Sequence, residues 1–433
     1  MTRVMCGTVV TGDGRTVHEP GFVVIEDGRI AAVGAGRGPA DDRLDLGRAI
    51  VAPGLVNPHA HGLTLGPIHA TGSPALTPER VRAFKDRHLR GGTTTVLSVD
   101  GLPTWDEYRA LADDHPLKVV KCTAHTPANL RAAELADGAG LEAAHREATV
   151  ADLLRVGARV IGEIGAGGTL GGGMQDYQYV PDAIERACGA RVDKHHARAI
   201  KEAVLGRSID PANLDRDALE RALGEAGLTG RLSPDEAVTV VTDCVMPSMA
   251  EAFEGMREAA ALAERHGVPF MVHHAAASAE VVLEVASERL VAAHCNHPSF
   301  TPDEAVHYAR ALRERGALLE LSGLDLFSKP RDEPDAAPFR ALVRAGLVDL
   351  IGTDYAGGGY DPVCVPLFAL VAEGLMPLAA AIASASGTIA RRLPTVTDAG
   401  LLEPGRPADL AVFSPDFDAV TAVYVDGERA HGA

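Results

Sequence analysis

Eight short apolar segments recur through the middle of the chain, and stretches with a helical spacing of apolar residues separate several of them. The segments contain few polar residues, which is typical of strands buried on both faces of a parallel sheet. Helical spacing is clear in residues 249–267 and 301–316. The predicted strands lie within residues 54–62, 93–101, 117–125, 158–166, 268–276, 289–297, 317–323 and 348–358. Eight strands alternating with helices predict a (β/α)8 TIM barrel, a fold of the α/β class.

The two ends of the chain have a different pattern. Residues 21–36 and 419–430 each place an Asp-Gly pair between two runs rich in β-branched residues, which is a β-hairpin signal. Because β-rich ends flank a barrel-like middle, we expect the termini to meet in one small β-domain. The predicted division is residues 1–52 with 391–433 for this domain and 53–390 for the barrel.

A long segment separates the fourth and fifth predicted strands. It covers about a hundred residues, whereas a loop between a strand and a helix usually has 2–6. We expect an insertion at about residues 168–245, which contains helical stretches of its own. Two roles stay open for it: a lid over the barrel mouth or a contact between subunits.

Composition narrows the classes of partner. The chain carries 41 basic and 59 acidic residues, and its net charge of −18 disfavours nucleic acid and anionic membranes as partners. No run of about 18 apolar residues predicts a membrane-spanning helix. The first residues lack the apolar core of a secretory signal. The 6 cysteines are scattered, which is typical of reduced thiols. We therefore expect a cytoplasmic protein.

Side chains of the types that bind metals stand where several predicted strands end. In a TIM barrel the carboxyl ends of the strands form the active site, so these side chains are expected to converge there. They are His59 and His61 in the first strand, Glu163 in the fourth, His273 in the fifth, His294 in the sixth and Asp354 in the eighth.

His59 and His61 are two residues apart on a predicted strand, so both side chains point to the same face. With 17 histidines in 433 residues, about one pair at this spacing is expected by chance, so the spacing alone carries little weight. Their place at a strand end favours a shared cation over one packed and one exposed histidine.

Two carboxylates complete this candidate site. Glu163 lies in the apolar stretch "VIGEIGAGG", where a buried carboxylate is costly unless it is paired or binds a metal. Its two oxygens can bridge two cations, and a salt-bridged core glutamate is the alternative. Asp354 ends the last strand, where it can hold a metal and accept a proton from water, or else be a structural turn residue.

His273 and His274 are adjacent, so strand alternation sends them to opposite faces and only one enters the barrel. We select His273 as the ligand, with His294 as the second imidazole of this half of the site. Further candidates at strand ends or beyond them are His125, His297 and Tyr355, which we expect to contact substrate. Lys121, a possible carbamylated bridge, lies on the third strand and competes with Glu163.

Over nearly its whole length the chain resembles the amidohydrolase superfamily of metal-dependent hydrolases. The resemblance rests on His59-Ala60-His61 after "APGLVNP", on Glu163, His273, His294 and Asp354, and on the C-terminal "GLLEPGRPADLAVF". It implies a barrel joined to a small β-sandwich domain built from both chain termini. Dihydroorotase- and hydantoinase-like members bridge two metals with a carboxylated lysine. Glu163 stands in that place here, which resembles the enamidase branch.

The resemblance also implies a cofactor and an activity. Two divalent metal ions per chain are expected, Zn²⁺ at both sites with Fe²⁺ or Mn²⁺ as the alternative at one. His59, His61 and Asp354 would hold the first metal, His273 and His294 the second, and Glu163 both. The implied reaction is hydrolysis of a C–N bond in a cyclic amide, lactam or imide by metal-activated hydroxide, with Asp354 as the catalytic residue.

Two other functions remain open. A deaminase of a nitrogen heterocycle would release ammonia, and such members often use one metal. A catalytically inactive scaffold of the same fold is the remote alternative, although such proteins usually lack some ligands and every ligand position is filled here. In each case we expect a small-molecule partner and a homo-oligomer.

Overall fold

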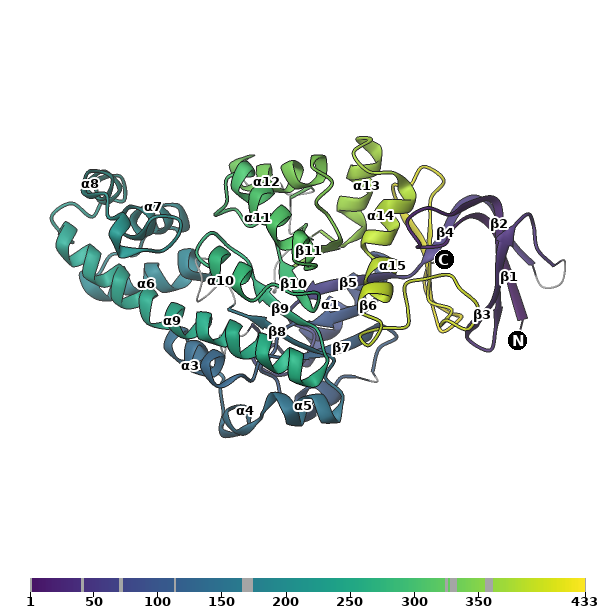
Figure 1. Cartoon of the computed structure of the whole chain (residues 1–433), viewed down its shortest axis with the longest axis horizontal. Helices are drawn as coiled ribbons and strands as arrows, with labels where there is room; N and C mark the ends of the chain where they lie inside the picture. Colours follow the sequence, from purple (N-terminus) through teal and green to yellow (C-terminus); the bar gives the residue numbers. More distant parts are fainter. Residues whose placement is uncertain are drawn as a thin grey trace.

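A closed sheet of eight parallel strands forms the centre of the molecule (Figure 1). The computed structural model describes residues 2–39, 43–69, 73–112, 114–165, 174–323, 326–327, 333–354 and 361–432. The strands are β5 (Leu55–Ala60), β6 (Thr93–Ser98), β7 (Lys118–Thr123), β8 (Val160–Ile164), β9 (Phe270–His273), β10 (Leu290–Ala293), β11 (Leu318–Ser322) and β12 (Leu350–Gly352). Each lies within a predicted strand segment, and they pair in sequence order, which confirms the predicted barrel.

Hydrogen bonds between the last strand and the first close the barrel. The backbone N–H groups of Thr353 and Asp354 both donate to the carbonyl oxygen of His59, over 3.3 and 2.9 Å. The Asn57 side-chain amide donates to the Thr353 hydroxyl over 2.8 Å. Alternate residues along the strands fill the interior, among them Val56, Leu97, Val99, Cys122, Val160, Met271, Val291 and Leu318.

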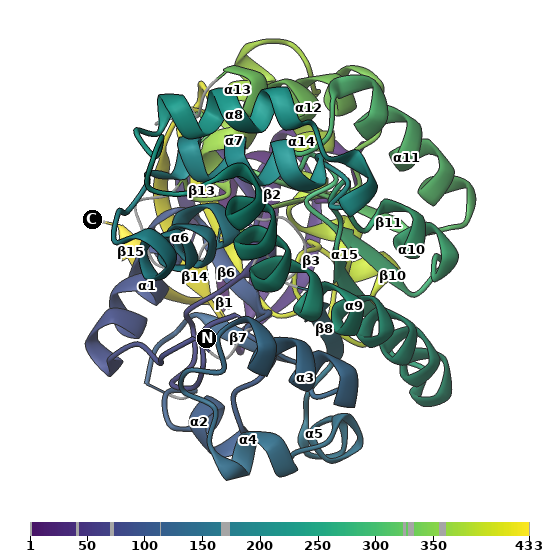
Figure 2. The same ribbon diagram turned by 90° about the vertical axis from the view of Figure 1, so that its left-hand side faces the viewer.

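Helices surround the strands on the outside (Figures 1 and 2). They are α1 (Pro78–Arg90), α2 (Trp105–Arg109), α3 (Pro127–Ala136), α4 (Ala143–Glu147), α5 (Val150–Val156), α10 (Ala279–Glu284), α11 (Pro302–Glu314), α12 (Glu333–Arg344), α13 (Cys364–Ala372), α14 (Leu378–Ser384) and α15 (Gly387–Arg392). Several begin at a sequence-encoded cap. At the start of α11, for example, Thr301 and Glu304 form a capping box, which satisfies two backbone N–H groups that the helix itself cannot pair.

Both ends of the chain build the second sheet, as predicted. Its strands run in the order β15-β14-β13-β4-β1-β2-β3. Their bounds are β1 (Thr2–Val10), β2 (Val17–Glu26), β3 (Arg29–Ala35), β4 (Arg43–Pro53), β13 (Leu410–Phe413), β14 (Val420–Val425) and β15 (Glu428–Gly432). The antiparallel pair of β4 and β13 joins the N-terminal and C-terminal halves. An isolated bridge between Arg29 and Pro407 also connects the two halves, and residues from both ends of the chain share one apolar core, as expected for the β-sandwich domain.

The two predicted hairpin turns have the backbone that their sequences require. Asp27 and Gly28 join β2 to β3 with φ of 49° and 76°, and Asp426 and Gly427 join β14 to β15 with 48° and 77°. Two consecutive residues with positive φ are the mark of a type I′ turn, for which Asp-Gly is a preferred sequence.

The long connection between β8 and β9 carries several helices at the end of the molecule opposite the β-domain (Figure 1). It contains the π-helix η1 (Gln175–Tyr179), α6 (Val180–Cys188), α7 (Lys194–Leu205), the 3₁₀ turn η2 (Pro211–Asn213), α8 (Arg216–Glu225) and the first part of α9 (Pro234–His266). The second part of α9 returns to the barrel and packs against α3. The two roles foreseen for this insertion, and the domain limits, stay predictions.

Within the described ranges, none of the helices is both long enough and apolar enough to cross a membrane.

Candidate metal centre

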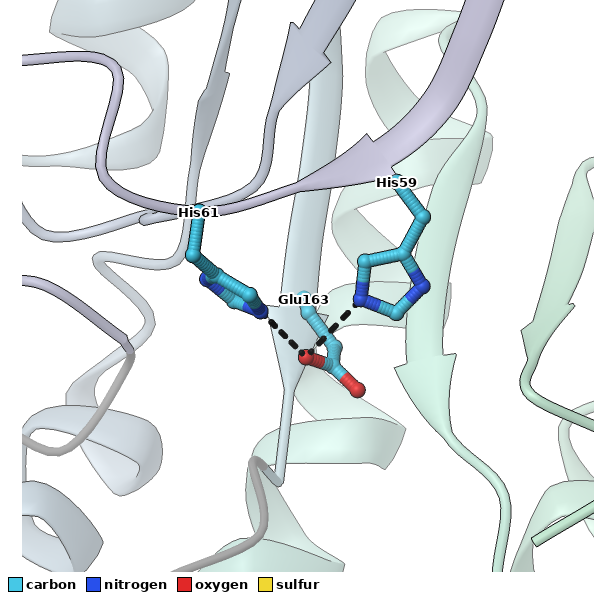
Figure 3. A group of neighbouring side chains, drawn as sticks. All are labelled: His59, His61 and Glu163. Carbon is cyan, nitrogen blue, oxygen red and sulfur yellow. Dashed lines mark ion pairs between the residues drawn. The ribbon is translucent and has the colours of Figure 1, made fainter. Parts of the chain in front are cut away.

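His59 and His61 leave the carboxyl end of β5 side by side and point toward the same carboxylate oxygen (Figure 3). Their Nε2 atoms lie 3.6 and 3.5 Å from Oε2 of Glu163. Both rings are buried, with 0% and 2% of each side chain exposed. The two-residue spacing therefore places both imidazoles on one face, as the sequence predicted.

Glu163 lies between two pairs of histidines. Its Oε2 faces His59 and His61, whereas its Oε1 lies 3.1 Å from Nδ1 of His273 and 3.0 Å from Nε2 of His294. Two triads that share Glu163 result, each with ligand atoms close enough to hold one cation. A carboxylate with one oxygen directed at each pair has the geometry of a bridge.

Asp354 joins the first of these triads from the end of β12. Its Oδ1 lies 3.4 Å from Nε2 of His59 and 3.6 Å from Nε2 of His61. Its side chain is 30% exposed, whereas only 2% of the Glu163 side chain is exposed. Asp354 is therefore the more exposed of the two carboxylates.

The structure separates His273 from its neighbour. Met271 belongs to the barrel interior, so strand alternation turns His273 inward and His274 outward. The His274 ring packs against Phe300 at 4.9 Å between ring centroids and against Tyr308 at 6.2 Å. Burial lowers the pKa of His274 to about 3, so it stays a neutral packing residue.

The electrostatics of the group favour a bound cation or protons. Burial lowers the pKa of His59, but the Asp354 and Glu163 carboxylates outweigh it and raise that pKa to about 10. Burial raises the pKa of Glu163, but the surrounding histidines outweigh it and hold that pKa well below its usual range. Because imidazole binds a metal only when that nitrogen is deprotonated, cations would displace these protons.

The residues fit a divalent metal pair. Nε2 of His59, which faces Glu163 and Asp354, is buried and has no hydrogen-bond partner in the part of the chain that the structure describes. Such orphaned polar atoms are rare in folded proteins unless a ligand satisfies them. Imidazole nitrogens and carboxylate oxygens are donors that Zn²⁺ accepts readily.

Two buried carboxylates that the sequence reasoning missed hold the first pair of histidines. Asp100 follows β6, and its Oδ1 lies 3.3 Å from Nδ1 of His61. Glu320 lies in β11, and its Oε2 lies 3.4 Å from Nδ1 of His59. Each contacts the ring nitrogen opposite the one that faces Glu163, as carboxylates behind metal-binding histidines commonly do. The sequence signal for Asp100 was an acidic residue just after an apolar strand, and the signal for Glu320 was a charged residue within the apolar segment "ALLELSG".

His69 was also missed. It comes from the loop after β5, and its ring lies 4.6 Å from that of His61. Its φ of 63° is uncommon for a residue with a side chain, and such residues gather at functional sites. Nothing in the sequence around it marks this proximity.

The predicted substrate residues fall in three different places. His297 lies beside the second histidine pair, with ring centroids 5.3 Å from His273 and 5.4 Å from His294. His125 lines a separate cavity of about 510 Å³, and its Nδ1 lies 3.1 Å from the Thr123 hydroxyl. Tyr355 lies outside the described residues.

Lys121 does not belong to the group around Glu163. Cys122 faces the barrel interior, so its neighbour Lys121 faces outward. Burial lowers the pKa of Lys121 to about 8, and the carboxylates of Asp100 and Glu107 act in the opposite direction.

Comparison with protein families and curated sequences gives two kinds of match. The model described as "Amidohydrolase family" matches residues 197–430. A 5-methylthioadenosine/S-adenosylhomocysteine deaminase from Nitratidesulfovibrio vulgaris (strain DP4) is 43% identical over 58 residues, which is 12% of this chain and 13% of the deaminase. An imidazolonepropionase from Salinispora arenicola (strain CNS-205) is 36% identical over 129 residues, which is 23% of this chain and 33% of that enzyme. The chain thus covers only these small shares of the curated relatives.

Several solved structures share the fold over their whole length. The A. niger ochratoxinase has a TM-score of 0.58 and 17% identity, covering 100% of this chain and 96% of its own. The N-acetyl-D-glucosamine-6-phosphate deacetylase from Mycobacterium smegmatis has a TM-score of 0.54 and 23% identity, covering 99% and 100%. The D-hydantoinase has a TM-score of 0.53 and 16% identity, covering 100% and 95%. These likenesses bear on the fold.

Proposed function

The chain belongs to the amidohydrolase family, and on this premise we propose that it hydrolyses a C–N bond of a cyclic amide, lactam or imide with two divalent cations. The observation that carries the proposal is the position of Glu163. One of its oxygens lies 3.5–3.6 Å from the His59 and His61 nitrogens, and the other lies 3.0–3.1 Å from those of His294 and His273.

Each ligand has a role in this proposal. His59, His61 and Asp354 would hold the first cation, His273 and His294 would hold the second, and Glu163 would contribute one oxygen to each. Zn²⁺ suits these donors, with Fe²⁺ or Mn²⁺ as the alternative at one site. When bound, such cations lower the pKa of water toward neutrality and act as Lewis acids on a carbonyl group.

Asp354 moves the proton in this scheme. It is part of the first triad and is 30% exposed, so its carboxylate can meet both a water at the site and a bound substrate. Burial raises its pKa, but the charge on His59 and the hydrogen bond with His61 outweigh it and hold the pKa of Asp354 below its usual range. Asp354 therefore starts as a base, accepts the proton of the attacking water and passes it to the leaving nitrogen.

A glutamate bridge supports the enamidase-like form of the proposal. The chain's other candidate for a bridge, Lys121, faces away from the barrel interior. The substrate would enter beside Asp354. His297 lies against the second pair of histidines and His69 against His61 of the first pair. His297 is our proposed substrate contact. His125 stays a weaker candidate because it lines a different cavity. Tyr355 stays a weaker candidate because it lies outside the described residues.

One observation favours a second function. A short segment is 43% identical to a 5-methylthioadenosine/S-adenosylhomocysteine deaminase, so release of ammonia from a nitrogen heterocycle is the alternative. A screen of cyclic amides, imides and amino-heterocycles on Zn²⁺-reconstituted protein distinguishes the two when ring opening and ammonia release are scored separately. We expect ring opening without ammonia. Ammonia release from amino-heterocycles alone would overturn the proposal in favour of the deaminase.

A further inference from the structure

We propose that Glu320 is a positioning residue that holds one ligand of each metal in place. The inference rests on the proposed two-metal site. Glu320 lies in the middle of β11, whose Leu318 belongs to the barrel interior, so strand alternation also turns Glu320 inward. Its side chain is 0% exposed.

The carboxylate of Glu320 contacts a ligand residue from two different strands. Its Oε2 accepts a hydrogen bond from the backbone N–H of His294 over 2.5 Å and lies 3.4 Å from Nδ1 of His59. The Ser322 hydroxyl donates to the same carboxylate, 3.1 Å from Oε1 and 3.3 Å from Oε2. Glu320 thus links β5 and β10 at the point where each presents a ligand.

The contact of Glu320 with His59 selects the tautomer of the His59 imidazole. A carboxylate beside Nδ1 favours the tautomer with the proton on Nδ1, which leaves the lone pair of Nε2 free. Nε2 is the atom directed at Glu163 and Asp354. Glu320 therefore fixes both the tautomer and the orientation that a cation requires.

Its contact with His294 holds an unusual backbone. Ala293 faces the barrel interior, so regular alternation would turn His294 away from Glu163. The φ of His294 is 36°, in the region that favours glycine, and this turn lets its Nε2 reach Glu163. The N–H bond to Glu320 holds the turn, because strained backbone persists only where its surroundings enforce it.

Glu320 pairs with a histidine of the site. Among the residues that the structure describes, no lysine or arginine pairs with it, and its ion-pair partner is His59. A buried carboxylate without a cation is costly, so the charge that balances Glu320 is expected at the metal site itself. This distinguishes Glu320 from Asp176, a buried carboxylate of the insertion that pairs with Lys201 and Arg198.

Asp100 provides a comparison at the same site. It lies behind His61 alone, and its other contacts are with the backbone of Gly62 and Leu63 and the hydroxyls of Thr64 and Ser98. Asp100 and Glu320 contact residues that would bind a metal, so each would act on the metal only through those residues. Only Glu320 reaches both halves of the site, so the two carboxylates should differ when each is replaced.

The test is a Zn²⁺ titration of the metal-free chain in competition with a chromophoric chelator, which reports both affinities. The variants are Glu320→Gln, Asp100→Asn and, as a control at a buried carboxylate that pairs with Lys201 and Arg198 in the insertion, Asp176→Asn. Thermal unfolding of each metal-free variant checks the fold. Changes behind metal-binding histidines typically cost about 10- to 100-fold in metal affinity. We expect this loss at both sites in Glu320→Gln, at one site in Asp100→Asn and at neither in Asp176→Asn.

The outcomes separate the two proposals. Wild-type protein that binds fewer than two Zn²⁺ per chain overturns the proposed function and the inference with it. Two Zn²⁺ in the wild type and an unchanged affinity at either site in Glu320→Gln overturn the inference alone.

A second variant applies if Glu320→Gln does not fold. Gly352→Ala keeps the carboxylate but places a Cβ atom 2.5 Å from Oε1 of Glu320 and 3.0 Å from Cβ of His59, so one of them must shift. We expect it to weaken both sites, and unchanged affinities in a folded Gly352→Ala would overturn the inference equally.

Discussion

The backbone N–H of Asp354 donates a hydrogen bond to the carbonyl oxygen of His59, with 2.9 Å between the two atoms. This bond joins the last strand of the barrel to the first. Barrel closure therefore also brings together two ligands of the first proposed metal. It holds Asp354 at a φ of 49°, a strained value for a residue with a side chain. Because the bond uses only main-chain atoms, the Asp354 carboxylate can be changed while the closure stays intact.

Asp354→Asn should lose activity far more than metal. The amide keeps the shape of the side chain and one oxygen for the cation, but it cannot accept and return a proton. We expect kcat to fall by about 10²- to 10⁴-fold, the usual contribution of general acid–base catalysis. Elemental analysis of the same sample should give nearly the wild-type metal content. Turnover at the native rate with metals intact would show that Asp354 is not the proton carrier.

Glu163→Gln should lose at least one metal. A neutral amide has a single acceptor oxygen, so it cannot present one oxygen to each histidine pair as the carboxylate does. The measurement is the metal content per chain after reconstitution and removal of excess Zn²⁺. Asp176→Asn, which changes a buried carboxylate of the insertion, is the control and should keep both metals. Two metals per chain in Glu163→Gln would refute the bridge.

Lys118→Met should weaken the attachment of the β-domain to the barrel. Lys118 of β7 lies 3.0 Å from both carboxylate oxygens of Asp409 and 2.7 Å from Asp426. The Asp409 side chain is 0% exposed, so loss of the ammonium leaves a buried charge unpaired. Breaking a buried pair costs 3–5 kcal/mol, and because Lys118 is 33% exposed we expect about 2 kcal/mol.

Urea unfolding measures this change, and the double variant Lys118→Met/Asp409→Asn should recover part of the loss. The interpretation fails if the single variant unfolds at the wild-type urea concentration.

His88 should make stability fall in acid. It is fully buried in α1, and burial, with a further contribution from Arg87, lowers its pKa to about 3. The unfolded chain has the ordinary value near 6.5, so it binds the proton more readily below that pH. His88 therefore has no effect on the free energy of unfolding above pH 6.5. As the pH falls from 6.5 to about 3, it lowers that free energy progressively, by about 1.4 kcal/mol at pH 5.5.

His88→Gln removes this group without a change in polarity. We expect the free energy of unfolding to fall by about 1.4 kcal/mol less between pH 7.5 and pH 5.5 than in the wild type. An equal decrease in both proteins would mean that His88 titrates normally in the folded state.

The period of apolar residues was sufficient to predict the barrel, because strands buried on both faces leave a strong pattern and parallel strands must alternate with helices. The same pattern placed His59, His61 and Glu163 at one end of it. Strand alternation also predicts opposite faces for His273 and His274, since a two-residue period continues to the end of β9. The assignment of His273 as the ligand stays a proposal.

The remaining parts depend on contacts between distant segments. Glu320 reaches His294 because of the register between β10 and β11. Asp100 reaches His61 because the loop after β5 passes beside it. A local sequence pattern encodes neither contact. His69 lies in an irregular loop. His125 stands at a strand end as expected, but its hydrogen bond to Thr123 directs it to the outer layer, a choice that position alone does not reveal.

The number of divalent cations bound per wild-type chain tests the central claim most directly. Metal-free protein is reconstituted with Zn²⁺, freed of excess metal, and measured by elemental analysis against an independent protein concentration. The two triads around Glu163 predict two Zn²⁺ per chain. A firm value of one would contradict the shared bridge and favour the deaminase, and a value of zero would contradict the metal centre altogether.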